Sequence, residues 1–164
     1  MAKYGVRNSM QSYEVQKKSK RRYEYGGRTF ASKPELALYI WLSDNGVAFK
    51  YNESDGIPYE YDGQMYFYFP DFEIIHSDSS YTLVEVKGKQ FFRPDGSMFL
   101  PYRAEHMTDS EYKRLCGKYE AKHQCMVQHN VKIIVDPSDE VNNYKKYVDE
   151  KYGKDFWLQC RKGK

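Results

Sequence analysis

The sequence predicts a single mixed α/β domain in which helices flank a central β-sheet. The first observation is the order of the predicted elements, which runs helix, several strands, helix, strand, helix. The second is size, because 164 residues with 40% apolar content suffice for one domain with a real core but not for two. The third is composition, since 30% charged and 17% aromatic residues are typical of a folded chain with a polar surface.

The first helix is predicted over residues 33–44. Ser32 occupies the N-cap position and Pro34 the first turn, while Asn45-Gly46 provides a stop signal. Apolar residues recur on one side of this segment. We therefore expect a helix that packs one face against the sheet.

Strands are predicted for most of residues 47–75, where apolar and polar residues alternate. Asp62-Gly63 indicates a hairpin turn within this region. A further strand, YTLVEVKG, covers residues 81–88.

The second half of the chain is predicted to be helical apart from one strand. An irregular insertion covers residues 88–108, and from Asp109 apolar residues keep to one face at helical spacing. The segment VKIIVD, residues 131–136, is a short buried strand. Ser138 begins a third helix, which Gly153 closes.

Positive charge is concentrated at the start of the chain. Residues 1–34 hold nine Lys or Arg against two Glu, whereas residues 35–164 hold 17 against 21 acidic residues. We expect a basic, partly flexible N-terminal arm over residues 1–30, a main domain over 31–155 and a basic C-terminal tail over 156–164.

Such an arm suits a polyanion, because phosphates attract the cations and binding releases counterions. The alternatives are a solubilising tail and a transport address. The residues predicted to bind nucleic acid are Lys17, Lys18, Lys20, Arg21, Arg22 and Lys89.

Charged residues interrupt two otherwise apolar strands, FPDFEII and YTLVEVK. If these strands form a hairpin over the loop HSDSS, Asp71 lies opposite Glu85, and Lys87 joins them on the same face. The opposite, buried face then carries Phe72, Ile74, Val84 and Val86.

Two carboxylates on neighbouring strands, with Cβ atoms about 5 Å apart, repel each other and favour a bound cation. Mg²⁺ is often held by one or two carboxylates, with water and phosphate oxygens completing its shell. Lys87 would then orient or deprotonate a water, or neutralise a phosphate. The alternative is an ion pair between Lys87 and the two acids on a solvated sheet face.

The motif PD at residues 70–71 followed by EVK at 85–87 resembles the signature of the PD-(D/E)XK nuclease superfamily. The upstream run SKPELALYIWLSDNGVAFKYNE is similar to the helix and first strand of that fold. Residues 32–88 are most similar to phage Holliday-junction resolvases of the endonuclease I type and to endonuclease subunits of cut-and-paste transposition systems. The resemblance implies a restriction endonuclease-like mixed central β-sheet flanked by helices, and Mg²⁺-dependent hydrolysis of DNA phosphodiester bonds, with Mn²⁺ as a substitute.

The resemblance also assigns roles by position. Asp71 and Glu85 would be metal ligands, with the Val86 carbonyl as a further ligand, and Lys87 would position the attacking water. Glu35 would bind a second metal or hold a metal-bound water.

Glu35 has another possible role, because Ser32-x-x-Glu35 is itself a capping box. In that case the carboxylate serves only the start of its own helix.

The insertion at residues 88–108 departs from the short resolvases, which pass almost directly from the strand into a helix. Its aromatic and basic residues would stack on bases or brace a backbone. The alternative is a surface loop tucked under its own aromatic rings. The residues concerned are Phe91, Phe92, Arg93, Tyr102 and Arg103.

A zinc site built from the second predicted helix fails on geometry. Cys116 and His123 project at nearly the same angle, whereas Cys125 and His129 point to the far side, so the four side chains cannot converge. His123 lies on the apolar stripe and is interpreted as a core or groove residue.

Taken together, these patterns predict a Mg²⁺-dependent DNA endonuclease, either junction-resolving or site-specific, acting on duplex or branched DNA as a homodimer or within a recombination or transposition complex. The alternative from a different class is a catalytically silent nucleic-acid-binding module with the same fold. No apolar run approaches the roughly 20 residues that span a bilayer, and the start lacks a secretion signal. We therefore expect no membrane partner and a cytoplasmic location, in the host if the protein is phage-encoded.

Overall fold

The structure is a computed structural model that describes residues 23–163. The predicted nucleic-acid contacts Lys17, Lys18, Lys20, Arg21 and Arg22 lie outside the described residues. Lys89 is exposed at the start of the short 3-10 helix η2 (Lys89–Phe91).

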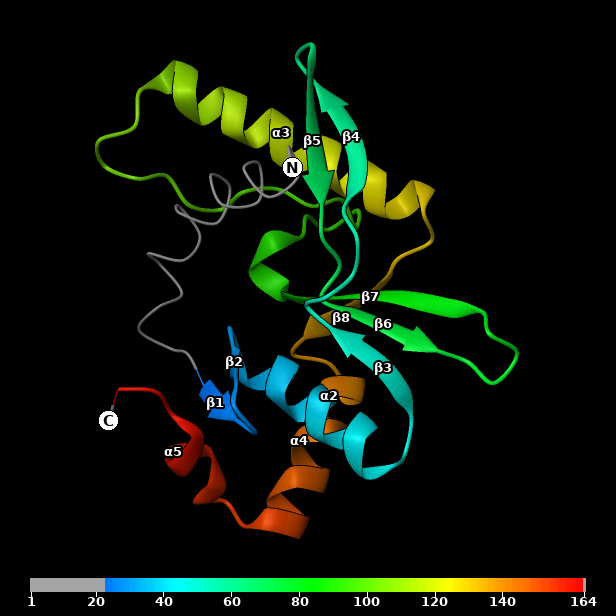
Figure 1. The fold of residues 1–164 in the computed structure, drawn as a ribbon. Helices are drawn as coiled ribbons and strands as arrows, with labels where there is room; N and C mark the ends of the chain where they lie inside the picture. The colour runs from blue at the N-terminus through cyan, green and yellow to red at the C-terminus, as the bar shows by residue number, and fades with distance from the viewer. Residues whose placement is uncertain (1–22, 164) are drawn as a thin grey trace.

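The centre of the molecule is a mixed four-stranded sheet with helices on both sides, which confirms the predicted α/β class (Figure 1). Its strand order is β3-β6-β7-β8, and only the β7–β8 pair is parallel. The strands are β3 (Ala48–Tyr51), β6 (Phe72–Ile75), β7 (Tyr81–Gly88) and β8 (Lys132–Asp136).

Helices α2 (Lys33–Asp44) and α4 (Asp139–Tyr152) cover one face of this sheet (Figure 1). The predicted bounds of α2 are confirmed, because the Ser32 hydroxyl accepts the backbone N–H of Glu35 at 3.3 Å as an N-cap. Ser138 caps α4 in the same way, and Gly153 ends it.

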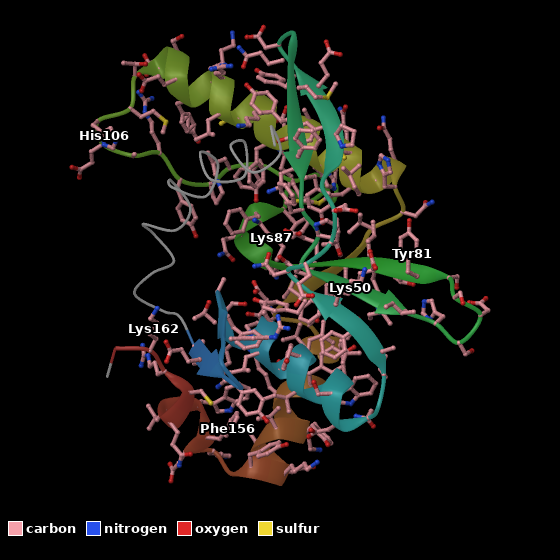
Figure 2. All side chains as sticks on the ribbon, viewed as in Figure 1. Lys50, Tyr81, Lys87, His106, Phe156 and Lys162 are labelled. Atoms are coloured by element: carbon pink, nitrogen blue, oxygen red, sulfur yellow. The ribbon has the colours of Figure 1, made fainter. Side chains whose placement is uncertain are left out.

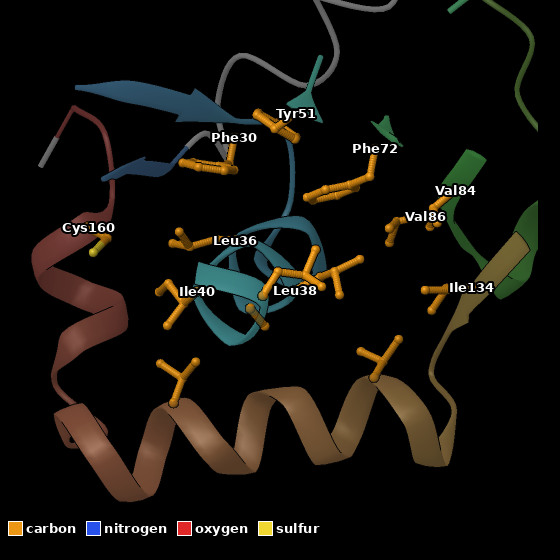
Figure 3. Close-up of a cluster of buried hydrophobic side chains, with 14 of the residues drawn as sticks. Phe30, Leu36, Leu38, Ile40, Tyr51, Phe72, Val84, Val86, Ile134 and Cys160 are labelled. Atoms are coloured by element: carbon orange, nitrogen blue, oxygen red, sulfur yellow. The ribbon is translucent and has the colours of Figure 1, made fainter. Parts of the chain in front are cut away.

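The main hydrophobic core lies between these helices and the sheet. Strand parity places alternate β-strand residues in it, as predicted, and α2 contributes a full set of aliphatic side chains. Figure 3 shows this cluster, which includes Leu36, Leu38, Ile40, Phe72, Val84, Val86 and Ile134.

The other face of the sheet is covered by a second layer with its own core (Figure 1). It consists of helix α3 (Asp109–Gln128), η2 and a hairpin of β4 (Ile57–Tyr61) and β5 (Gln64–Tyr68). The turn at Asp62-Gly63 is confirmed, with both residues at positive φ. The hairpin forms a sheet of its own rather than extending the central one, because Tyr59 and Tyr68 are buried against α3.

The structure differs from the prediction at both ends of the main domain. Strands β1 (Tyr23–Tyr25) and β2 (Arg28–Phe30), expected within the basic arm, form a hairpin whose Phe30 is in the main core. Residues 156–160, expected in a basic tail, form α5 (Phe156–Cys160), which buries Phe156, Trp157 and Cys160. These few apolar residues are ordered by contacts with each other, such as the edge-to-face pair of Tyr25 and Phe156.

Among residues 23–163, none of the helices combines the length and apolarity that a membrane crossing requires.

The close approach of the hairpin to α3 explains a glycine within a helix. A Cβ atom at Gly117 would clash with the Tyr61 hydroxyl, so glycine lets the hairpin dock. Glycine inside a helix otherwise costs about 1 kcal/mol relative to alanine.

We expect Gly117→Ala to give no gain in the free energy of unfolding in the native protein, because the clash offsets the better helix propensity. In a Tyr61→Ala background the same substitution should raise this free energy by about 1 kcal/mol. Urea denaturation of the four proteins of this cycle measures the coupling. An equal gain in both backgrounds would contradict the docking contact.

Candidate active site

The predicted hairpin register is confirmed by the pairs Ile75 with Tyr81 and Glu73 with Leu83. Asp71 immediately precedes β6, and its N–H donates to the Val84 carbonyl at 3.0 Å. Its Oδ2 accepts the Val86 N–H at 2.8 Å. The Asp71 carboxylate is therefore held beside the segment of β7 that carries Glu85.

Burial singles out the predicted site residues. Within residues 23–163, only four charged or polar side chains are buried, and three of them are Glu35, Glu85 and Lys87, at 6%, 5% and 7% exposure. Charged side chains are rarely so buried unless a partner or a function retains them. Asp71 is half-buried.

Tyr68 at the end of β5 holds Glu85. Its hydroxyl donates to Glu85 Oε1 at 2.9 Å, and the side chain is fully buried. Burial, followed by the negative charges of Glu85 and Asp71, raises the pKa of Tyr68 far above its usual value. The phenol therefore stays protonated and can donate its hydrogen bond, and the charges of both carboxylates contribute to its raised pKa.

Glu35 is held by a second buried tyrosine. The Tyr51 hydroxyl on β3 donates to Glu35 Oε2 at 2.9 Å. One of the two hydrogen bonds of the predicted capping box is present, because the backbone N–H of Glu35 donates to the Ser32 hydroxyl. Within the described residues no three His, Cys, Asp or Glu side chains form a metal-binding group, so Glu35 is not gathered with Asp71 and Glu85.

Lys87 projects into the second layer, between the two halves of the molecule (Figure 2). Its Nζ lies 4.4 Å from the centre of the Phe91 ring and 5.2 Å from that of Tyr119. In the part of the chain that the structure describes, Lys87 makes no ion pair and no side-chain hydrogen bond. The alternative of an ion pair on a solvated face therefore does not hold for the described residues.

The insertion packs two of its phenylalanines into the protein, whereas Arg93, Tyr102 and Arg103 are exposed. Phe91 and Phe92 pack against the second core, and the Phe91 ring stacks on Tyr119. Arg93 pairs with Glu120 at 2.8 Å and Arg103 with Asp109 at 2.5 Å. Only Tyr102, at 41% exposure, remains an exposed aromatic residue of the five predicted to contact bases.

The histidine and cysteine residues of α3 serve its packing. His123 Nδ1 accepts the backbone N–H of Met98 at 3.3 Å, and burial lowers the pKa of this histidine. His129 Nδ1 lies 2.9 Å from the Cys125 carbonyl oxygen. His123 is thus a half-buried residue with a hydrogen-bond partner, consistent with the core or groove role interpreted from the sequence.

The donor set of the site fits a hard divalent cation. Asp71 and Glu85 offer carboxylate oxygens, and Mg²⁺ prefers oxygen ligands and needs only one or two carboxylates from a protein. Each carboxylate also has a donor that fixes it, the Val86 N–H for Asp71 and the Tyr68 hydroxyl for Glu85. Such outer contacts are what orient metal ligands.

Sequence reasoning missed Tyr68 and Tyr51. The chain has seventeen tyrosines, and nothing local to these two distinguishes them from the rest. Their role depends on which carboxylate accepts the hydrogen bond of each hydroxyl, which follows only from the packing of the layers.

No protein-family model, no curated protein and no solved structure matches this chain.

We expect Tyr68→Phe to lower the free energy of unfolding by about 1–3 kcal/mol, because the buried Glu85 carboxylate loses its donor. Urea denaturation at neutral pH measures this change. Tyr81→Phe is the matched control, since Tyr81 is 61% exposed, and should change the free energy by less than about 0.5 kcal/mol. Equal effects of the two substitutions would show that Glu85 does not need the phenol.

Proposed function

We propose that this protein is a Mg²⁺-dependent DNA endonuclease of the PD-(D/E)XK type, with a restriction endonuclease-like fold. The observation that carries the proposal is Lys87, a lysine that is buried on the same strand face as Glu85 and makes no ion pair within the described residues.

A buried lysine is costly to retain, and an apolar side chain of similar length would fill the same space at lower cost. Local conflicts of this kind are expected where function requires them. Lys87 lies beside two carboxylates, and the combination of two acids with a lysine can hold a cation and an anionic substrate together. A phosphodiester with its metal ion matches that pattern of charge.

Asp71 and Glu85 would hold the metal, with the Val86 carbonyl as a further ligand. When bound, Mg²⁺ would supply charge stabilisation at the scissile phosphate and lower the pKa of a water molecule. Lys87 would orient that water or face the phosphate charge. Tyr68 would keep Glu85 in position as a ligand.

Glu35 has a less direct role in this proposal. Its carboxylate is bonded to Tyr51 and is not grouped with the other two acids. A second metal or a metal-bound water would require Glu35 to reorient, so the resting arrangement supports a one-metal site.

The substrate would be duplex or branched DNA, contacted by the exposed Lys89 and by the basic residues of the arm, which are Lys17, Lys18, Lys20, Arg21 and Arg22. Cutting both strands would require a homodimer or a larger recombination or transposition complex. The proposed setting is the cytoplasm.

The second candidate is a catalytically silent nucleic-acid-binding module. The observation that favours it is the absence of a group of three metal ligands among the described residues, together with the burial of Glu85. Metal binding and cleavage separate the two candidates.

We expect 10 mM Mg²⁺ or Mn²⁺ to raise the melting temperature of the native protein by several °C, because a bound cation relieves the repulsion between Asp71 and Glu85. An excess of about 100-fold over Kd gives about 2.7 kcal/mol, and each kcal/mol gives about 2–4 °C in a domain of this size. Asp71→Asn should abolish the shift. The control Glu150→Gln, at an exposed position of α4, should retain the shift in melting temperature.

A shift of equal size in Asp71→Asn would place the metal elsewhere. No shift in the native protein, with EDTA as the reference, would favour the silent module.

We expect metal-dependent cutting of at least one substrate in a panel of linear duplex, single strand, flap and four-way junction, with Mg²⁺, Mn²⁺ or EDTA. Lys87→Met keeps the length of the side chain, removes the charge and should slow cutting by about 10²–10⁴-fold. Lys146→Met is the control, because Lys146 is 72% exposed on α4. Salt-sensitive binding without any cutting would contradict the endonuclease.

A further inference from the structure

Helix α3 carries a row of cations on the face toward the β4–β5 hairpin. Arg114, Lys118 and Lys122 recur every fourth residue, so they lie within one face and are about 6 Å apart along the axis. The spacing is similar to that between successive phosphates of an extended nucleic-acid strand.

Tyrosines of the hairpin hold this row in place. Arg114 Nη2 donates to the Tyr66 hydroxyl at 2.9 Å and to Gln64 Oε1 at 3.2 Å. Lys118 Nζ lies 3.9 Å from the centre of the Tyr66 ring, and Lys122 Nζ lies 5.8 Å from that of Tyr68. Cation–π contacts of this kind orient an ammonium without neutralising it.

The row leads to the candidate active site. Lys122 lies next to the rings of Tyr68 and Tyr119. Tyr68 donates to Glu85, and the Tyr119 ring lies 5.2 Å from Lys87 Nζ. The end of the row is thus one aromatic ring away from each of the two buried charges.

Acidic side chains of the described residues lie near the row. Asp62 Oδ2 is 4.0 Å from Arg114 Nε, and Glu111, one turn earlier on the same face, caps the helix through Thr108. Glu120 pairs with Arg93.

We propose that Arg114, Lys118 and Lys122 bind successive phosphates of the DNA and guide one strand along the hairpin to Lys87. This inference rests on the proposed function and adds the route by which substrate reaches the site. Contacts of cations to phosphates are independent of base sequence and depend on salt concentration.

The test is the salt dependence of DNA binding by the full chain. Fluorescence anisotropy of a labelled duplex and a labelled four-way junction is measured in EDTA, so that binding is read without cleavage. For duplex DNA, the slope of log Kobs against log[salt] should become shallower by about 1.8 in Lys118→Gln/Lys122→Gln, because about 0.9 is lost for each phosphate contact.

Two matched variants control for charge and folding. Lys118→Arg/Lys122→Arg keeps both charges and should restore the native slope. Lys146→Gln/Lys154→Gln removes two exposed lysines from α4 and the residues after it, and should leave the slope unchanged. Melting temperatures confirm that each variant folds.

An unchanged slope in Lys118→Gln/Lys122→Gln, or an equal loss in the α4 control, would overturn the cation row even if the native protein cuts DNA. A native protein that binds with the predicted slope change but never cuts would leave the row in place and overturn the endonuclease. A native protein that binds no DNA would overturn both.

Discussion

The structure depends on strand β7, because its residues 84–87 are buried on both faces. Val84 and Val86 meet the main core, whereas Glu85 and Lys87 meet the second layer. A buried charge needs a compensating contact inside the protein. The chain meets this need with aromatic side chains, a phenol for Glu85 and the rings of Phe91 and Tyr119 for Lys87.

The second layer thus covers one face of the central sheet and buries Glu85 and Lys87. Its hairpin is built from tyrosines that pack like apolar residues and still offer hydroxyl groups. The same hairpin supports the candidate ligand Glu85 through Tyr68 and orients the cations of α3 through Tyr66. Gly117 allows this arrangement, because a Cβ atom there would overlap the end of the Tyr61 side chain and force it to shift. The packing of the second layer, the candidate site and the proposed DNA route therefore all depend on the contact between the β4–β5 hairpin and α3.

Local signals in the sequence predicted the parts of the fold that local physics determines. The caps of α2 and α4 and the β6–β7 register were found because N-cap residues and period-2 alternation act within a few residues. The register also placed Asp71 beside β7. Burial of Glu85 and Lys87 was not predicted, since parity assigns a face but not what covers it. The core roles of Phe30 and Trp157 likewise depend on contacts between the two ends of the chain.

Enclosure has a consequence for any nuclease built on this site. The Lys87 side chain is only 7% exposed, and the Phe91 ring covers it, with its centre 4.4 Å from Nζ. Phe91 belongs to the one-turn helix η2. The Phe91 ring contacts Tyr119 and Tyr102, and Gln90 Nε2 donates a hydrogen bond to the Tyr102 hydroxyl at 3.3 Å. These contacts hold η2 in place. Displacing η2 would break the Phe91 contacts with the second core and the hydrogen bond from the Phe99 N–H to the Phe91 carbonyl, whereas moving β7 would disrupt both cores. Under the proposed function, substrate access would therefore depend on η2, within the insertion at residues 88–108.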